Sequence, residues 1–137
     1  MTYIDYLYTI YVDNLCMKGV GTLAVNKNLI TGSTTMLILK LLEDKDMYGY
    51  MMIEELAKRS DNTFSLKAGT LYPLLHGLEE QGMINSYDEM ADNSRVRKYY
   101  SITKKGRKLL QEQKEEWNTY SSTVDRILRG GASFGRI

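Results

Sequence analysis

The sequence predicts a mainly helical α+β domain in which three helices precede a two-stranded ribbon and one long helix follows it. Apolar residues recur at helical spacing through most of the chain after residue 33. Two short segments rich in β-branched and aromatic residues interrupt that pattern between residues 83 and 103. A chain of 137 residues, with 43% hydrophobic and 26% charged residues, is the size of one globular domain with its own core.

Residues 1–32 form an N-terminal extension whose structure the sequence specifies least. Apolar side chains recur there at helical spacing, but the segment is rich in Tyr, Ile, Thr and Val, which fit strands as well. Gly19 and Gly21 would interrupt whichever element forms. Two interpretations stay open, an extra packing helix and a partly disordered extension.

Two helices are expected to follow this extension. Ser33 or Thr34 can cap the first helix, which is largely apolar and ends in a polar turn at residues 43–46. The second helix is expected over about residues 48–59, with polar side chains on one face. Gly49 removes a side chain at its start, which suits close approach of another helix.

The third helix is expected within Leu66–Ile84, and the rest of the chain is organised around it. Leucines at i, i+3, i+4 and i+7 from Leu71 form one apolar stripe, so one face packs against the core. Pro73 falls in the second turn, where a slight bend is expected, and Gly82 suits the C-terminal end. The opposite face is left free to contact a partner.

Two strands and a long helix complete the chain. Residues 83–87 and 96–103 are predicted to be strands joined by a polar connection of hairpin type. Helices followed by such a ribbon make a winged helix-turn-helix, which we expect over residues 33–103. Residues 104–129 are predicted to form one helix with apolar and aromatic residues in steps of three and four, typical of a helix that packs along another. This pattern predicts a homodimer, and residues 130–137 are left as a tail.

Basic side chains gather in the second strand and in the start of the last helix. Residues 94–108 hold seven Lys and Arg and no acidic residue, although the whole chain has a net charge of only +1. Such runs often form a solvated surface, but beside a helix with a free face this one indicates binding to the phosphates of double-stranded DNA. The side chains expected to contact DNA are Lys67, Thr70, Tyr72 and His76 on the third helix and Arg95, Arg97 and Lys98 on the ribbon.

Three sequence blocks carry a family resemblance. They are Ile38-Leu39 with Tyr48-Gly49-Tyr50, then Gly69-Thr70-Leu71-Tyr72-Pro73-Leu74-Leu75-His76 with Gly82, then Arg97-Lys98-Tyr99-Tyr100 with Ile102-Thr103 and Gly106. In order and spacing they resemble the PadR family of winged-helix transcriptional regulators, over about residues 32–110. The resemblance implies a homodimeric DNA-binding repressor of the smaller subgroup, in which a single C-terminal helix builds the dimer. Two positions depart from the family pattern, since Gly77 replaces a common basic residue and Ala68 a common proline.

Trp117 lies on the seam of the long helix and has two interpretations. Aromatic residues at this spacing usually form dimer core. The resemblance implies a second role, because a tryptophan at this place in some small PadR-like regulators faces its symmetry mate across a pore and stacks flat aromatic drugs. Gln113 and Tyr120, one turn to either side, would then line a site for a small aromatic or hydrophobic effector.

Several function classes find little support in the composition. With Cys16 and His76 as the only cysteine and histidine, the chain offers little material for a disulfide framework, a metal site or a hydrolase triad. We therefore expect no enzyme activity, cofactor or metal. No stretch approaches the roughly 18 to 20 apolar residues of a membrane span, and a cytoplasmic location fits best. The remaining alternative to DNA binding is a winged-helix module that contacts other proteins.

Overall fold

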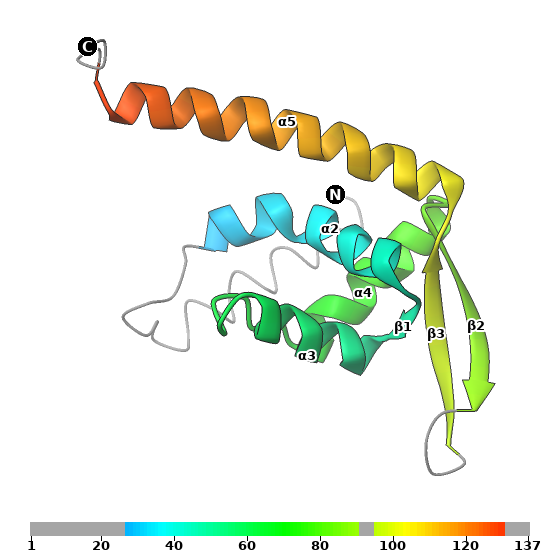
Figure 1. Cartoon of the computed structure of the whole chain (residues 1–137). Helices are drawn as coiled ribbons and strands as arrows, with labels where there is room; N and C mark the ends of the chain where they lie inside the picture. Colours follow the sequence, from blue (N-terminus) through cyan, green and yellow to red (C-terminus); the bar gives the residue numbers. More distant parts are fainter. Residues whose placement is uncertain (1–26, 91–94, 131–137) are drawn as a thin grey trace.

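The computed structural model describes residues 27–90 and 95–130. The elements are α2 (Lys27–Asp44), β1 (Met47–Tyr48), α3 (Gly49–Arg59), α4 (Ala68–Glu80), β2 (Ile84–Met90), β3 (Val96–Ile102) and α5 (Lys104–Leu128). Figure 1 shows α2, α3 and α4 packed together, the ribbon of β2 and β3 extending from one end, and α5 running along α2 and beyond it. The predicted α+β winged helix-turn-helix is confirmed. The expectations for residues 1–26 and for the tail from residue 131 lie outside the described residues.

Helix α2 begins earlier than the sequence pattern indicated. It starts at Lys27, so its first turns lie within the segment that was expected to be an extension. Ser33 and Thr34 lie inside the helix and are 6% and 7% exposed, so the capping role predicted for them is wrong. Hydroxyl side chains favour helix starts, but they also occur inside helices, where they can bond to the backbone of the preceding turn.

One hydrophobic core joins the helices and the sheet. In α4 three of the four leucines of the predicted stripe are buried, with Leu71 and Leu75 fully covered and Leu78 3% exposed. The fourth, Leu74, is half-buried and packs against the same core. Burying each such side chain stabilises the fold by about 1.5 to 3 kcal/mol. Leu110, 1% exposed, adds the start of α5 to the same core. This core therefore fixes both α4 and the first turns of α5.

The sheet has three antiparallel strands in the order β1-β3-β2. The two strands of the ribbon are those expected, although β2 continues to Met90 rather than ending near residue 87. Strand β1 was not foreseen, because two residues are too short to show an alternating pattern. It pairs Met47 with Tyr100 and Tyr48 with Tyr99, and it thereby attaches the ribbon to the helical body.

The end of α4 and the start of α5 are tied to each other. Helix α4 ends at Glu80, and Gly82, two residues beyond it, has a φ of +79°, which confirms the helix-stopping role expected for this glycine. The Thr103 hydroxyl donates to the Gly82 carbonyl at 2.7 Å and accepts from the Gly106 N–H at 3.0 Å, so it caps α5 at the same time. The Lys105 ammonium donates to the Gln81 carbonyl at 2.9 Å. Because of these bonds, a displacement of the first turn of α5 would also displace the end of α4.

Candidate nucleic-acid interface

The outer face of α4 is the first part of the candidate interface. Lys67, which precedes the helix, and Tyr72 and His76 within it are exposed, whereas Thr70 is half-buried. The Lys67 side chain makes no capping bond, and the first turn carries no acidic residue. Because the N-terminal end of a helix carries a partial positive charge, this end of α4 suits an anionic partner.

The C-terminal end of α4 has the opposite character. His76 Nε2 lies 3.6 Å from Glu80 Oε2, and both side chains are well exposed. Glu79 accepts a hydrogen bond from the Ser86 hydroxyl at 2.5 Å, which turns its carboxylate toward β2. Glu80 would repel an anionic partner, so such a partner suits the part of α4 that precedes Glu79.

Tyr72 is positioned by α3. A Cβ atom at Gly49, the first residue of α3, would overlap the Tyr72 ring and lie 2.8 Å from its Cε1. This confirms the close approach of another helix that was expected at Gly49. The Tyr72 ring therefore lies over the start of α3 while 44% of the residue stays exposed.

The ribbon carries Arg95, Arg97 and Lys98, but these side chains have different surroundings. Successive side chains of a strand point to opposite faces, so Arg97 and Lys98 cannot lie on the same side of the ribbon. Across the ladder Lys98 pairs with Asp88 and Arg97 with Glu89. These acids offset part of the positive charge that the sequence run suggested. Arg95 and Lys98 are exposed, and they are the basic side chains of the ribbon most accessible to a partner.

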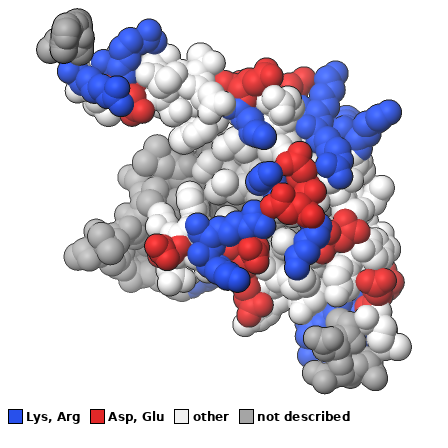
Figure 2. All heavy atoms as spheres, in the orientation of Figure 1, with Lys and Arg blue, Asp and Glu red and all other residues white. Residues whose placement is uncertain are grey.

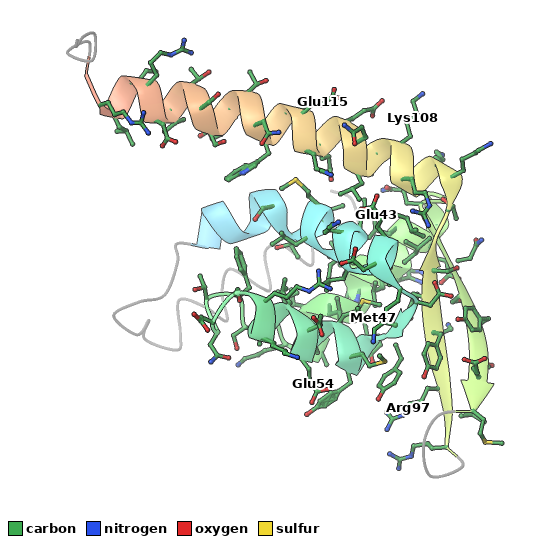
Figure 3. The ribbon with its side chains drawn as sticks, viewed as in Figure 1. Glu43, Met47, Glu54, Arg97, Lys108 and Glu115 are labelled. Carbon is green, nitrogen blue, oxygen red and sulfur yellow. The ribbon has the colours of Figure 1, made fainter. Side chains whose placement is uncertain are left out.

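Arg97 is held against the helical body. Its guanidinium carbon lies 4.8 Å from the centroid of the Tyr48 ring, a cation–π arrangement. Figure 3 shows the side chain on the side of the ribbon that faces α3. The Nε atom is buried, and no residue of the described part of the chain bonds to it. Arg97 therefore serves to orient the ribbon as well as offering its remaining N–H groups to a partner.

Three tyrosines form a row across the sheet that the sequence analysis missed. Tyr48 and Tyr87 both pair with Tyr99, and the ring centroids are 5.3 Å apart for Tyr48–Tyr99 and 5.8 Å for Tyr87–Tyr99. The Tyr87 hydroxyl donates to Asp46 at 2.7 Å, and this bond to a carboxylate raises the pKa of Tyr87 to about 12. The row links all three strands, and Asp46 ties it to the turn after α2. No pattern in the sequence signals this row, because its three tyrosines come from separate segments that the register alone brings together.

The four basic residues at the start of α5 form a separate group. Lys104, Lys105, Arg107 and Lys108 are exposed, and Figure 2 shows Lys and Arg side chains gathered over this end of the helix. They lie at the base of the ribbon, whereas Arg95 lies at its tip. A seven-residue strand separates the two by roughly 20 Å, so the run of seven charges is divided into two groups.

The residues proposed to contact an effector lie together on another surface. Trp117 and Tyr120 are 43% and 61% exposed, with ring centroids 6.3 Å apart. Gln113 is half-buried, and its side-chain oxygen has no hydrogen-bond partner in the part of the chain that the structure describes. Ile127 and Leu128, further along α5, are 71% and 77% exposed. An apolar surface therefore extends along the outer half of α5.

Two other kinds of site are missing from residues 27–90 and 95–130. Within them, no group of three or more His, Cys, Asp and Glu side chains is placed to hold a metal ion. The helices of the same residues include none that is long and apolar enough to span a membrane.

Comparison with known proteins gives consistent matches over this domain. The model of the PadR-like transcriptional regulator family matches residues 38–112. A Lysinibacillus sphaericus protein described as uncharacterized is 34% identical over 106 residues, which cover 77% of this chain and 97% of that protein. A transcriptional regulator of Mycobacterium tuberculosis is 34% identical over 77 residues, which cover 56% of this chain and 68% of the relative.

Solved structures with the same fold match three quarters or more of the chain. A PadR-like transcriptional regulator from Bacillus cereus is 32% identical, with a TM-score of 0.68, over 75% of this chain and 98% of its own. A PadR family transcriptional regulator from Eggerthella lenta is 29% identical, with a TM-score of 0.67, over 90% of this chain and 96% of its own.

Proposed function

The chain belongs to the PadR-like family of transcriptional regulators, and from this premise we propose that it is a homodimeric repressor that binds double-stranded DNA. In the proposed complex the outer face of α4 enters the major groove and the ribbon lies along the adjacent phosphate backbone. The observation that carries this proposal is the exposed first half of α4, free of acidic side chains, beside a ribbon with two exposed basic residues. A regulator of this kind works on the cell's DNA, so the proposal includes a cytoplasmic location.

The residues have different roles in this proposal. Thr70, Tyr72 and His76 face the base edges, where hydroxyl, phenol and imidazole groups can donate or accept hydrogen bonds. Lys67, Arg95 and Lys98 neutralise phosphates, which supplies affinity without reading the sequence. Arg97 orients the ribbon through Tyr48 and adds a further positive charge.

The apolar surface of α5 supports the homodimer. Trp117, Tyr120, Ile127 and Leu128 are large hydrophobic residues that a single copy leaves exposed. Their spacing is that of a helix that packs along another helix, and a second copy of α5 would cover them.

An aromatic or hydrophobic effector is proposed to bind at the same seam. Trp117 and Tyr120 offer stacking surfaces, and the unpaired side-chain oxygen of Gln113 can accept a hydrogen bond from the ligand. A panel of flat aromatic compounds should quench Trp117 fluorescence saturably and displace DNA. Absence of quenching across the panel would count against the effector and leave the DNA-binding proposal standing.

The test of DNA binding begins with selection of a duplex from a random-sequence pool by the full chain. The affinity of the chain for this duplex should fall steeply as the salt concentration rises. Loss of one phosphate contact should reduce the magnitude of the slope of log K against log salt by about 0.9. Arg95→Ala and Lys98→Ala should each show this loss. Lys114→Ala removes the same charge from an exposed position of α5 and is the matched control, with no expected change.

The alternative is a winged-helix module that binds another protein and not DNA. One observation favours it, since Asp88 and Glu89 face Lys98 and Arg97 across the ladder and bring the ribbon close to neutrality. An affinity for the selected duplex that responds neither to salt nor to Arg95→Ala and Lys98→Ala would support the protein-binding module. That result would also rule out the phosphate contacts.

A further inference from the structure

Gly69 is an exposed glycine in the first turn of α4 with no structural reason to be glycine. A Cβ atom built there would meet no side chain, and no backbone beyond its own turn of helix, within 4 Å among residues 27–90 and 95–130. The described glycines with positive φ are Gly82 and Gly130, so Gly69 does not need the left-handed conformation either. Within a helix, glycine is less favourable than alanine because it loses more backbone freedom on folding.

At other glycines of the domain, packing or backbone conformation requires the absence of a side chain. A Cβ at Gly49 would overlap the Tyr72 ring, and a Cβ at Gly106 would overlap the backbone carbonyl of Met83. Gly82 ends α4 with a positive φ. Each of these is explained by contacts or conformation within the described residues, and Gly69 has no such explanation among them.

The position of Gly69 indicates what that partner is. Gly69, Tyr72 and His76 stand at i, i+3 and i+7, so they share one face of α4, and all three are exposed. This is the face proposed to enter the major groove. A missing side chain on such a face permits close approach of the backbone to a ligand.

We propose that Gly69 is the position at which the backbone of α4 comes closest to the base edges of the DNA. The inference rests on the proposed function and adds to it a residue that determines how deeply the helix is inserted. The first turn of α4 enters the groove further than a side chain at position 69 would allow. This depth lets the Tyr72 ring, on the same face, reach the bases.

The test combines two measurements on the full-length Gly69→Ala and Gly69→Leu variants. Thermal unfolding should show a midpoint raised by about 2 to 8 °C for Gly69→Ala, since alanine favours the helix and the site is open. Affinity for the duplex selected by the wild-type chain should fall about fivefold for alanine and about fiftyfold or more for leucine, as expected when contacts with base edges are lost. A variant that is more stable and yet binds more weakly cannot owe its loss of affinity to unfolding.

Asn118→Ala is the matched control, because it raises helix propensity at an exposed position of α5. It should raise the midpoint slightly and leave the affinity unchanged. Wild-type affinity of both Gly69 variants would overturn the inference and leave DNA binding intact. A lowered midpoint for Gly69→Ala would also overturn it, since Gly69 would then have a packing role. If the wild-type chain selects no duplex at all, the proposed function fails and the inference fails with it.

Discussion

Gly106 offers a severe test of how the long helix is joined to the domain. A Cβ atom at this position would overlap the carbonyl oxygen of Met83 and lie 2.8 Å from Ile102 Cγ1. That carbonyl cannot move freely, because it accepts hydrogen bonds from the Thr103 N–H and from the Thr103 hydroxyl, both at 3.0 Å. Gly106→Ala should therefore destabilise the domain although alanine is the better helix former.

The change in the free energy of unfolding is the sum of two destabilising contributions and one stabilising contribution. Forcing a methyl group into a closely packed site costs about 1 to 3 kcal/mol. Displacing the Met83 carbonyl weakens two hydrogen bonds, each of which stabilises by about 0.5 to 1.5 kcal/mol. Alanine returns about 1 kcal/mol through its higher helix propensity. The net loss in free energy of unfolding is about 1 to 5 kcal/mol on these values.

Urea unfolding of the full chain, followed by circular dichroism, measures this loss as a lower midpoint at unchanged slope. Gly69→Ala is the control, since the same methyl group enters open space there and should raise the midpoint. If Gly106→Ala unfolds at or above the midpoint of the wild type, the junction between α4 and α5 is not tightly packed at this position.

Three further predictions concern the ribbon, the start of α3 and the seam of α5. Since the bond to Asp46 raises the pKa of Tyr87 to about 12, its stabilisation should be complete below the ordinary tyrosine pKa near 10 and disappear as pH rises through about 12. The urea midpoints of the wild type and Tyr87→Phe should differ below this window and converge within it; a difference that persists above pH 12 would contradict the assignment. Gly49→Ala should displace the Tyr72 ring and weaken DNA binding several-fold, with a smaller loss of stability than Gly106→Ala because an exposed ring can rotate; unchanged affinity would remove Tyr72 from the interface. Ile127→Asp should convert a dimer into a monomer in sedimentation experiments at micromolar concentration, and a stable dimer of this variant would exclude the seam.

The elements that were predictable from the sequence are those specified by local periodicity. The leucine stripe lies within α4 and Gly82 follows two residues after its end, and both are found where the pattern placed them. Strand β1 and the row of Tyr48, Tyr87 and Tyr99 depend instead on pairing between distant segments. Local patterns do not show which residues of distant segments pair, so these three tyrosines could not be recognised as a row.

The basic residues between positions 94 and 108 show that side chains close in the sequence need not form one surface. Seven positive charges within fifteen residues suggest one surface, but an extended strand carries Arg95 far from the start of α5. The acids that face the basic residues of β3 belong to β2, whose Asp88 and Glu89 precede the run in the sequence. The surface charge near the proposed DNA backbone is therefore smaller than the sequence run indicated, and α4 must supply more of the affinity.

The junction at Gly106 connects the two surfaces on which the proposed function depends. Thr103 and Lys105 bond to the last carbonyls after α4, and Leu110 fixes the next turn of α5 in the core. In the proposed dimer, the α5 seam sets the relative orientation of the two copies. The junction then fixes the position of each α4 relative to its own α5. Trp117 lies eleven residues beyond Gly106, about 16 Å along the helix axis. A ligand at the seam therefore needs no contact with DNA to affect binding: a tilt of α5 against its partner changes the spacing of the two α4 helices, which must match the spacing of successive major grooves.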